Sequence, residues 1–294
     1  MANNKILISG YTGFIGNNLF KNIDPENILL INRESFNQNF KIFDYNLNSV
    51  DLEIVKKYKL IFIHLATFFS KSVDDNEKIH LGNIEFGNNI LENIQDFNIL
   101  KIIYTNTMYK YYPDENLRES YYCKTKNQFS DIIEKFCNNF KICKDEIFLD
   151  NTFGKNDNRD KIIPLIVREL KSGKGNPISN PNNSINLTHV DHVIKNILLS
   201  IKNPNSSSTY SLIGKKSLIL QSIFDFLHDF SNNGKINIDL IKYVDNEYLK
   251  ETGESFFHFI IARNNKEIST KLINNNLRIM NIREYLADKS FGHY

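Results

Sequence analysis

The sequence predicts an α/β protein: a doubly wound parallel sheet with a smaller, mixed α/β lobe at the C-terminal end. Short apolar runs alternate with longer helical patterns up to about residue 150, which is the layout of parallel strands joined by crossover helices. A glycine-rich turn, GYTGFIG, directly follows the first of these runs. Beyond residue 150 the alternation loosens and loop-forming segments appear. We therefore expect one domain over residues 1–155 and a smaller lobe over 156–294, with parts of the lobe woven back into the first domain.

The alternation can be followed element by element along the chain. Six apolar runs are interpreted as successive strands, at 5–9, 27–31, 41–43, 60–66, 101–107 and 146–150. Patterns with helical spacing lie between or after them, at 14–23, 50–58, 76–97, 121–140, 189–201 and 220–230, and the segment 173–184 is loop-forming. In the 121–140 helix an apolar stripe predicts a surface for the core or for a dimer; it consists of Phe129, Ile132, Ile133, Phe136 and Phe140.

Composition excludes several classes of protein. With 294 residues and 41% hydrophobic content, the chain can bury a sizeable core. The formal net charge is only +2 and no basic stripe is present, so nucleic acid is not an expected partner. The apolar run at 60–69 is too short to span a bilayer, and the N-terminus lacks a signal-peptide layout, so we expect a cytoplasmic protein. The three cysteines show no metal-ligand spacing, and no metal is expected.

The turn GYTGFIG predicts a phosphate-binding loop of the Rossmann type. Gly10, Gly13 and Gly16 stand between the first strand and the first helix. Glycines there permit a tight turn and close approach of the backbone to a pyrophosphate, while the helix N-terminus offers free amide donors. A plain strand-to-helix turn is the alternative for the motif alone. Its position at the start of a strand, turn and helix favours a dinucleotide.

The end of the second strand bears on which dinucleotide is bound. An NAD enzyme presents an acidic residue to the ribose about 20 residues after the loop, whereas an NADP enzyme presents arginine to the 2′-phosphate. The sequence there is INRES, with Asn32, Arg33 and Ser35. These residues favour NADP(H). NAD(H) is the alternative, because Glu34 could turn inward and leave Arg33 in solvent.

The stretch YYCKTK holds two tyrosines and two lysines. Only Tyr122 and Lys126 stand four residues apart, so on a helix only they share a face one turn apart. An exposed, solvated face is the ordinary interpretation of such a pair. The phosphate loop and the polar end of the fifth strand, at Thr107, favour a chemical role instead.

A series of ordered segments resembles the extended short-chain dehydrogenase/reductase family of nucleotide-sugar epimerases, dehydratases and reductases. They are GYTGFIG (10–16), HLAT (64–67), GNIEFGNNILE (82–92), YTNT (104–107), YCKTK (122–126), DNTFG (150–154) and HVDHV (189–193). The match runs in order over roughly residues 5 to 200. Within the family, the short chain and the segments IHLAT, IIPLIV and IARNNK are most similar to the synthases of CDP-abequose and CDP-paratose, which reduce a CDP-4-keto-dideoxy sugar.

The resemblance implies a role for each matching residue. The catalytic residues would be Thr107, Tyr122 and Lys126. Those at the cofactor would be Gly10, Thr12, Gly13, Phe14, Ile15, Gly16, Asn32, Arg33, Ser35, Asp44, Tyr45, Leu65, Ala66, Thr67, Asn83, Thr105, Tyr122 and Lys126, with Asp44 facing adenine. Substrate would be held by Thr67, Thr107, Asn151, Arg168 and Arg263. The helices at 76–97 and 121–140 would pair in a homodimer.

These roles predict a reduction. Lys126 would favour the tyrosinate form and bind the nicotinamide ribose, Tyr122 would protonate the substrate oxygen and Thr107 would hold it. Met108 and Tyr109 stand where a dehydratase of the family has Asp-Glu, which disfavours dehydration. We expect an NADPH-dependent reductase of a 4-keto (deoxy) nucleotide sugar, acting in surface-polysaccharide synthesis such as that of O-antigen. Alternatives are a 4-epimerase with tightly held NAD(P) and a non-catalytic NADP-binding sensor or scaffold.

The sequence departs from the family where the substrate diphosphate would bind. Ile185 and Asn186 stand where family members have Arg-Asp, and Gly253 stands near the place of a second arginine. Loss of two guanidiniums removes bidentate anion contacts. Lys155, Arg168 and Arg263 are the candidate substitutes.

Overall fold

The computed structural model describes residues 4–34, 39–112, 114–154, 157–166, 182, 184–212 and 218–219. They fall into two compact units, one made of residues 4–148 with 196–210 and the other of the remaining described residues. Both residues that flank the predicted domain boundary, 155 and 156, lie outside the described part, as do the predicted helix over 220–230 and nearly all of the predicted loop over 173–184. That domain boundary stays a prediction.

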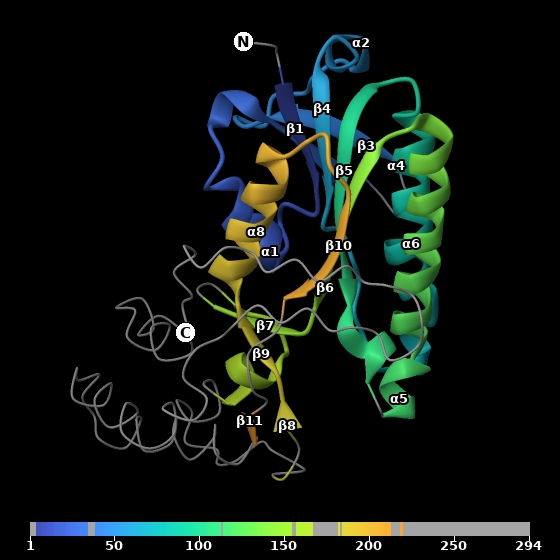
Figure 1. Cartoon of the computed structure of the whole chain (residues 1–294), viewed down its shortest axis with the longest axis vertical. Coiled ribbons are helices and arrows are strands. Elements are labelled where there is room, and N and C mark those ends of the chain that lie inside the picture. The colour runs from blue at the N-terminus through green and yellow to red at the C-terminus, as the bar shows by residue number, and fades with distance from the viewer. Residues whose placement is uncertain are drawn as a thin grey trace, which may run out of the picture. The chain divides into compact units, whose positions relative to one another are not determined.

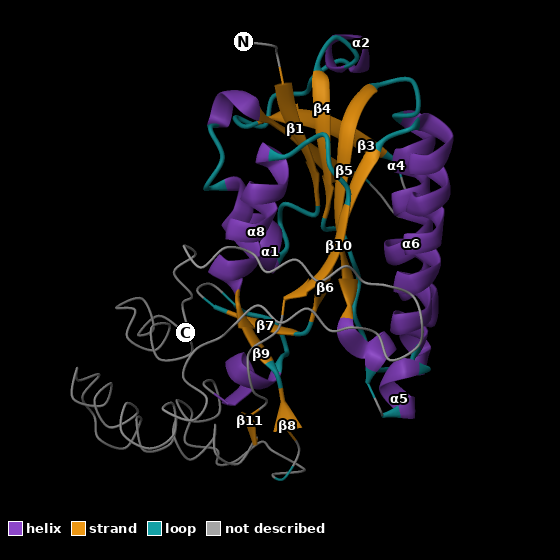
Figure 2. Cartoon of the chain, viewed as in Figure 1, coloured by secondary structure: helices purple, strands orange, loops and turns teal. Residues whose placement is uncertain are grey.

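A seven-stranded sheet forms the centre of the first unit (Figures 1 and 2). Its strand order is β10-β6-β5-β4-β1-β2-β3. The bounds are β1 (Asn4–Ser9), β2 (Ile28–Arg33), β3 (Phe40–Asp44), β4 (Lys59–His64), β5 (Asn98–Thr107), β6 (Cys143–Leu149) and β10 (Ser208–Leu212). β1 is parallel to both β2 and β4, and β4 is parallel to β5. The mainly parallel, doubly wound sheet is thus confirmed, and all six predicted strands are present.

Strand β3 departs from the parallel arrangement. It runs antiparallel to β2, with Ile31 opposite Ile42 and Arg33 opposite Phe40. Only residues 34–39 connect the two strands. A parallel pair needs a crossover of a dozen residues or more, so a connection this short forces the chain to turn back directly. Strand β3 was predicted correctly, but its parallel direction was wrong.

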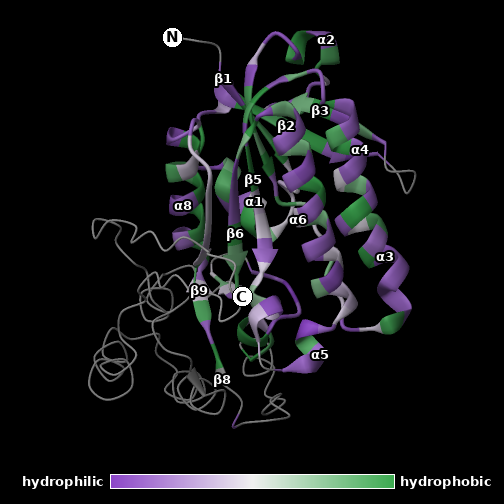
Figure 3. Ribbon diagram, turned by 45° about the vertical axis from the view of Figure 1, so that its right-hand side comes forward, coloured by the Kyte–Doolittle hydropathy of each residue, from purple (hydrophilic) through white to green (hydrophobic). Residues whose placement is uncertain are grey.

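Helices cover both faces of this sheet. In Figure 1, α4 and α6 lie on one side of the strands and α1 lies on the other, and Figure 3 shows α3 beside α4 and α6. Their bounds are α1 (Phe14–Phe20), α2 (Leu52–Val55), α3 (Asn76–His80), α4 (Phe86–Asn93), α5 (Glu115–Arg118), α6 (Tyr121–Phe140) and α8 (Val190–Lys202). Short 3₁₀ turns lie at Pro25–Asn27, Val73–Asp75 and Met108–Tyr111. A π-helical turn, Leu81–Glu85, joins α3 to α4 and interrupts the single helix predicted over 76–97.

Helix α6 has the bounds that the sequence predicts. The Ser120 side chain accepts a hydrogen bond from the backbone N–H of Cys123, which satisfies one of the unpaired donors of the first turn. At the other end Lys141 adopts the left-handed conformation with φ 56°, and its N–H donates to the carbonyl of Cys137. These caps fix which residues occupy the first turn, and Tyr122 is one of them.

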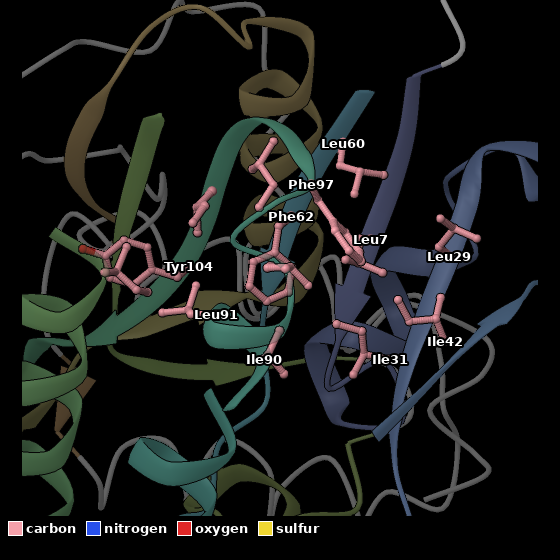
Figure 4. Packing of buried hydrophobic residues seen from close by; sticks show 14 of the residues in the cluster. Leu7, Leu29, Ile31, Ile42, Leu60, Phe62, Ile90, Leu91, Phe97 and Tyr104 are labelled. Carbon is pink, nitrogen blue, oxygen red and sulfur yellow. The ribbon is translucent and has the colours of Figure 1, made fainter. Parts of the chain in front are cut away.

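The main core lies between the sheet and helices α4 and α6 (Figure 4). Leu7, Phe62 and Tyr104 contribute to it from neighbouring strands, and Phe129 contributes from α6. A Cβ added at Gly87 of α4 would lie 2.3 Å from the Phe129 ring, so this glycine lets the two helices pack closely. Figure 3 shows polar residues on the outer faces of the helices. Burial of a ring such as Phe129 is worth about 3–5 kcal/mol relative to alanine.

The second unit contains two short pairs of strands. β7 (Asn151–Phe153) is parallel to β9 (Leu187–His189), and β8 (Ser184–Ile185) is antiparallel to β11 (Leu218–Ile219). Across the described part of the chain, every helix is too short or too polar to cross a membrane.

Candidate active site

The loop after β1 can be built only with glycine at two of its positions. Gly10 has φ +76°, and a Cβ there would lie 2.4 Å from the backbone nitrogen of Ala66. A Cβ at Gly16 would lie 2.2 Å from the carbonyl oxygen of Gly10. The N–H of Gly13 donates to that same oxygen at 3.1 Å, which closes the turn. The loop is therefore packed tightly against the chain that leaves β4, where Leu65 donates its N–H to Ser9 at 3.0 Å.

The N-terminus of α1 suits an anionic ligand. Its N-cap residue is Gly13, which offers no side chain to the first amides, and the first turn holds no acidic residue. Thr12 and Gly13 are exposed, whereas Phe14 is buried and Ile15 half-buried beneath them. A helix N-terminus with glycine at its N-cap and no acidic residue in its first turn fits the pyrophosphate of a dinucleotide.

Replacing Gly16 and Gly13 by alanine should have different effects. In Gly16→Ala the new Cβ meets backbone, so we expect a loss of about 1–3 kcal/mol in unfolding free energy together with weaker cofactor binding. In Gly13→Ala the Cβ meets only Gly10 O at 3.3 Å, so stability should change little and cofactor affinity should fall. Thermal unfolding and cofactor titration measure both. Equal destabilisation by the two variants would contradict this interpretation of the loop.

The end of β2 presents a cation. Asn32 and Arg33 are exposed, and the Arg33 guanidinium lies 5.6 Å from the centre of the Phe86 ring on α4. Glu34, the residue that could have competed for the ribose, places its carboxylate 2.5 Å from the Lys41 ammonium on β3. Ser35 lies outside the described residues.

Asp44 organises the turn that follows β3. Its carboxylate accepts hydrogen bonds from the backbone N–H of Asn48 at 2.9 Å and from the Asn48 side chain at 3.0 Å. These bonds hold the pKa of the Asp44 carboxyl below its ordinary value. Tyr45, 37% exposed, lies with its ring 5.9 Å from that of Phe20. The adenine contact predicted for Asp44 stays a prediction.

Thr107 ends β5 and is 5% exposed. Its hydroxyl oxygen accepts the N–H of Tyr109 at 3.3 Å and so caps the 3₁₀ turn that follows. Its own N–H donates to the side-chain oxygen of Asn106 at 2.7 Å. Because a hydroxyl has one hydrogen and two lone pairs, this capping role leaves the Thr107 hydrogen available to a substrate oxygen. Thr105, two residues earlier on the strand, is also buried.

Tyr122 and Lys126 occupy the first two turns of α6. Tyr122 is half-buried, with its ring 4.9 Å from that of Phe69 and 6.1 Å from that of Tyr109. Lys126 is only 6% exposed, and burial lowers the pKa of its ammonium to about 8, an effect that the charge of Glu146 opposes. Tyr121, in contrast, is exposed, and its hydroxyl lies 3.3 Å from Nδ1 of His80. A lysine buried this deeply is not part of a solvated helix face.

Asn83 holds this region together. Its side-chain oxygen accepts from Thr67 Oγ1 at 2.9 Å and from the N–H of Phe68 at 2.7 Å. Its amide nitrogen donates to the Phe68 carbonyl and to Thr125 Oγ1, both at 3.1 Å. Thr125 in turn donates to the carbonyl of Tyr122 at 2.9 Å. Through these bonds Asn83 links α6 to the segment after β4. Asn83 lies in the π-helical turn, and such turns are frequent at functional sites.

His64 at the end of β4 was not among the predicted site residues. It is 1% exposed, its Nδ1 lies 2.8 Å from Ser9 Oγ, and its ring lies 4.8 Å from that of Phe129. Burial, and then the charge of Lys126, lower the pKa of His64 to about 3. It is therefore a neutral neighbour of Lys126. A histidine inside an otherwise apolar strand was the signal in the sequence.

The predicted substrate residues are only partly described. Asn151, at the start of β7, donates from its amide to Asp150 at 2.8 Å and to the carbonyl of Asn186 at 3.3 Å. Arg168, Arg263 and Lys155 lie outside the described residues. Arg159 is described, and it makes a bidentate ion pair with the buried carboxylate of Asp157 at 2.7 and 2.8 Å. The Arg159 guanidinium is therefore already paired with a carboxylate of the protein itself.

Comparison with known proteins identifies the family. The model of the NAD dependent epimerase/dehydratase family matches residues 6–213. The chain belongs to this family. The curated CDP-abequose synthase of Salmonella muenchen is 20% identical over 267 residues, which are 87% of this chain and 91% of that protein. The resemblance drawn from the sequence motifs is confirmed.

Solved structures of other proteins share the fold. A UDP-N-acetylglucosamine 4-epimerase from Methanobrevibacter ruminantium M1, in complex with UDP-N-acetylmuramic acid, has a TM-score of 0.66 and 18% identity and covers 99% of this chain and 98% of its own. The Bordetella bronchiseptica enzyme WbmF, in complex with NAD+, has a TM-score of 0.62 at 14% identity and covers 80% of each chain. As an enzyme of the NAD dependent epimerase/dehydratase family, the protein uses a nicotinamide dinucleotide, which the glycine loop fits.

Proposed function

We propose that the protein is an NADPH-dependent reductase of a 4-keto nucleotide sugar, of the deoxy type incorporated into surface polysaccharides. The observation that carries the proposal is the burial of Lys126, one helical turn after the half-buried Tyr122. An ion kept out of solvent at a free-energy cost is typical of sites where its charge is used.

Each residue then has one task. The Lys126 ammonium stabilises negative charge on the Tyr122 oxygen, which makes that hydroxyl a usable acid at neutral pH. Tyr122 donates its proton to the oxygen at C4 of the sugar, and Thr107 donates a hydrogen bond to the same oxygen and orients it. When bound, the nicotinamide supplies the hydride to C4. Neutral His64 adds no second charge beside Lys126.

The preference for NADP(H) depends on Arg33. The pairing of Glu34 with Lys41 supports it, because the carboxylate that could accept the ribose 2′-hydroxyl is engaged elsewhere. Arg33→Ala should weaken NADPH binding roughly tenfold or more and leave NADH binding nearly unchanged. Glu34→Gln is the matched control and should not alter the preference. Equal affinities of wild type and Arg33→Ala for NADPH, measured by fluorescence titration, would show that Arg33 is a solvated loop residue.

Two observations support the reductase over other reactions of the family. The curated relative that matches is named as a CDP-abequose synthase. Met108 and Tyr109 follow Thr107, and neither side chain has the carboxylic acid that a dehydratase needs. Met108 is buried, and Tyr109 packs against Tyr122 and Phe69.

A 4-epimerase is the second candidate, because solved structures with this fold include 4-epimerases. Both reactions use the same three side chains and differ in whether the oxidised cofactor leaves. A sensor or scaffold that binds NADP without chemistry is the third.

Isotope transfer separates the three. Purified protein is mixed with NADPH carrying deuterium at the transferred position and with CDP- or dTDP-4-keto-6-deoxy sugars. A reductase consumes one NADPH per product and places one deuterium in the sugar. An epimerase, given instead the corresponding nucleotide sugars that carry a C4 hydroxyl, interconverts their C4 epimers without net consumption of cofactor. Binding of NADPH without turnover on the whole panel would favour the sensor.

We also propose a homodimer that pairs the segment 76–97 and α6 with their copies. Tyr121 and Phe140, at the two ends of α6, are 37% and 45% exposed and would be covered in such a dimer. Light scattering of the purified protein should give twice the chain mass of 34.3 kDa.

A further inference from the structure

Strand β6 buries two neighbouring carboxylates, and they face opposite sides of the sheet. Asp145 is 4% exposed and lies 2.7 Å from the Lys101 ammonium, which explains its burial. Glu146 is 7% exposed. Successive side chains of a strand alternate, so Glu146 points toward the side covered by α6. A buried carboxylate requires compensating partners, and one of those of Glu146 is Asn106, which also contacts Thr107.

Two donors converge on one oxygen of Glu146. Asn106 donates from its side-chain amide to Oε1 at 2.7 Å, and Ser130 donates from its hydroxyl to the same atom at 2.7 Å. The Tyr104 hydroxyl lies 3.0 Å from Ser130 Oγ. Because the single Ser130 hydrogen is used toward Glu146, Tyr104 must be the donor in that contact. Asn106 and Ser130 therefore direct their hydrogens toward the carboxylate, as they would toward an anion, and Tyr104 donates to Ser130 behind them.

The network reaches Thr107 by a second route. Asn106 uses its nitrogen for Glu146 and its oxygen for the N–H of Thr107, at 2.7 Å in both bonds. Glu146 thus fixes which way the Asn106 amide points, and that amide fixes the last peptide of β5. A rotation of the Asn106 amide would remove the acceptor from the Thr107 N–H.

The same carboxylate lies along the catalytic face of α6. Tyr122, Lys126 and Ser130 are spaced at four-residue intervals, so they form one row on the helix. Ser130 touches Glu146, and Lys126 is the next member of the row toward Tyr122. The row places a negative charge one helical turn beyond the buried ammonium.

We propose that Glu146 is a positioning residue for the reductase reaction: it holds Thr107 in place through Asn106, and its negative charge keeps Lys126 protonated. The inference rests on the proposed function. Glu146 would thus be a fourth residue of the site, beside Thr107, Tyr122 and Lys126. It would act only through Thr107 and Lys126.

The titratable groups around the pair support this assignment. Burial lowers the pKa of Lys126 to about 8 while Glu146 raises it, and His64 on β4 stays neutral. Burial and then Glu146 raise the pKa of Tyr104, and they raise that of Tyr111 to about 12. Both phenols therefore remain uncharged near neutral pH, and within the described part of the chain Glu146 is the carboxylate whose charge raises the pKa of Lys126.

The test uses paired variants of the full chain. Glu146→Gln keeps an oxygen for Asn106 and Ser130 but removes the charge. Its reductive kcat should equal that of wild type at low pH, and the basic limb of its pH profile should move toward lower pH by on the order of one unit. Glu146→Asp keeps the charge, but its shorter side chain moves the carboxylate oxygen away from Asn106 and Ser130. Its basic limb should stay in place while kcat falls roughly tenfold at every pH.

Asp145→Asn is the matched control, because it removes the neighbouring carboxylate from the opposite face. It should lower the melting temperature and leave the pH profile unchanged. The proposal is overturned if the basic limb of Glu146→Gln coincides with that of wild type, or if Asp145→Asn moves it equally.

A readout that does not need turnover keeps this test separate from that of the proposed function. NMR titration of protein labelled at the lysine ε-carbon follows the ionisation of Lys126, whose signal is assigned by its loss in Lys126→Met. In Glu146→Gln the Lys126 signal should titrate at lower pH than in wild type. An unchanged titration overturns the proposal even in an active enzyme. A shifted titration in a protein that reduces no keto sugar would contradict only the proposed function.

Discussion

Replacing Lys126 by methionine should remove nearly all reductase activity and at the same time make the protein more stable. The methionine side chain fills a similar volume without a charge, at a position that is 6% exposed. Loss of the ammonium removes the charge that makes Tyr122 a usable acid, so we expect kcat to fall about a hundredfold or more. Cofactor binding should also weaken, if the ammonium binds the nicotinamide ribose.

The gain in stability follows from the pKa of Lys126. Burial lowers it from 10.5 in the unfolded chain to about 8 in the folded one. Below pH 8 both states carry the proton, and the folded state bears the cost of burying the charge. As the pH rises from 8 to 10.5 the folded state releases the proton while the unfolded state keeps it, so wild-type stability should rise across this window. At neutral pH the Lys126→Met protein should be more stable by about 2 kcal/mol.

Denaturant unfolding at several pH values measures both effects. The control is Lys124→Met, on the same helix but exposed and 3.2 Å from Glu119. It should change neither activity nor the pH dependence of stability by much, since surface ion pairs contribute little. A Lys126→Met protein that is less stable than wild type would show that the ammonium is well solvated or fully paired, and the account of its burial would be wrong.

Tyr122→Phe should lower kcat by roughly two to four powers of ten. The substitution removes one oxygen and leaves the ring in contact with Phe69 and Tyr109, so the fold and the cofactor site should be unaffected. What is lost is the proton that neutralises the developing alkoxide. NADPH binding should therefore change little while its oxidation by the keto sugar nearly stops.

Tyr121→Phe provides the matched control, because it makes the same chemical change one residue earlier on an exposed side chain. It should keep wild-type kcat. Single-turnover loss of NADPH absorbance, compared among wild type and the two variants, measures the outcome. Near wild-type rates in Tyr122→Phe would assign the proton to another group, such as a bound water.

Local rules predict most of this fold and part of the site. The strand positions and the bounds of α6 follow from apolar runs, helical spacing and the Ser120 cap, which are all properties of neighbouring residues. The four-residue spacing also distinguishes Tyr122 from Tyr121, and in the structure Tyr121 is exposed while Tyr122 is half-buried. Even the direction of β3 could have been predicted from the length of the connection before it.

The rest depends on neighbours that lie far apart in the chain. Glu146 looks like the solvated end of a strand, because nothing nearby in the sequence shows that Asn106 and Ser130 will meet it. Similarly, nothing nearby in the sequence predicts the four hydrogen bonds of Asn83, which go to residues 67–68 and Thr125. Such contacts arise from sheet order and helix packing, which periodicity does not encode.

Tyrosinate formation tests the central claim most directly. The ultraviolet absorbance of tyrosinate is followed as the pH is raised, in the presence of saturating NADP+, for wild type, Tyr122→Phe and Lys126→Met. The account predicts that one phenol of the wild-type protein ionises before all others, and that this early step is missing from both variants. An early step that persists in Tyr122→Phe, or its absence from the wild-type protein, would contradict the pairing of Tyr122 with Lys126.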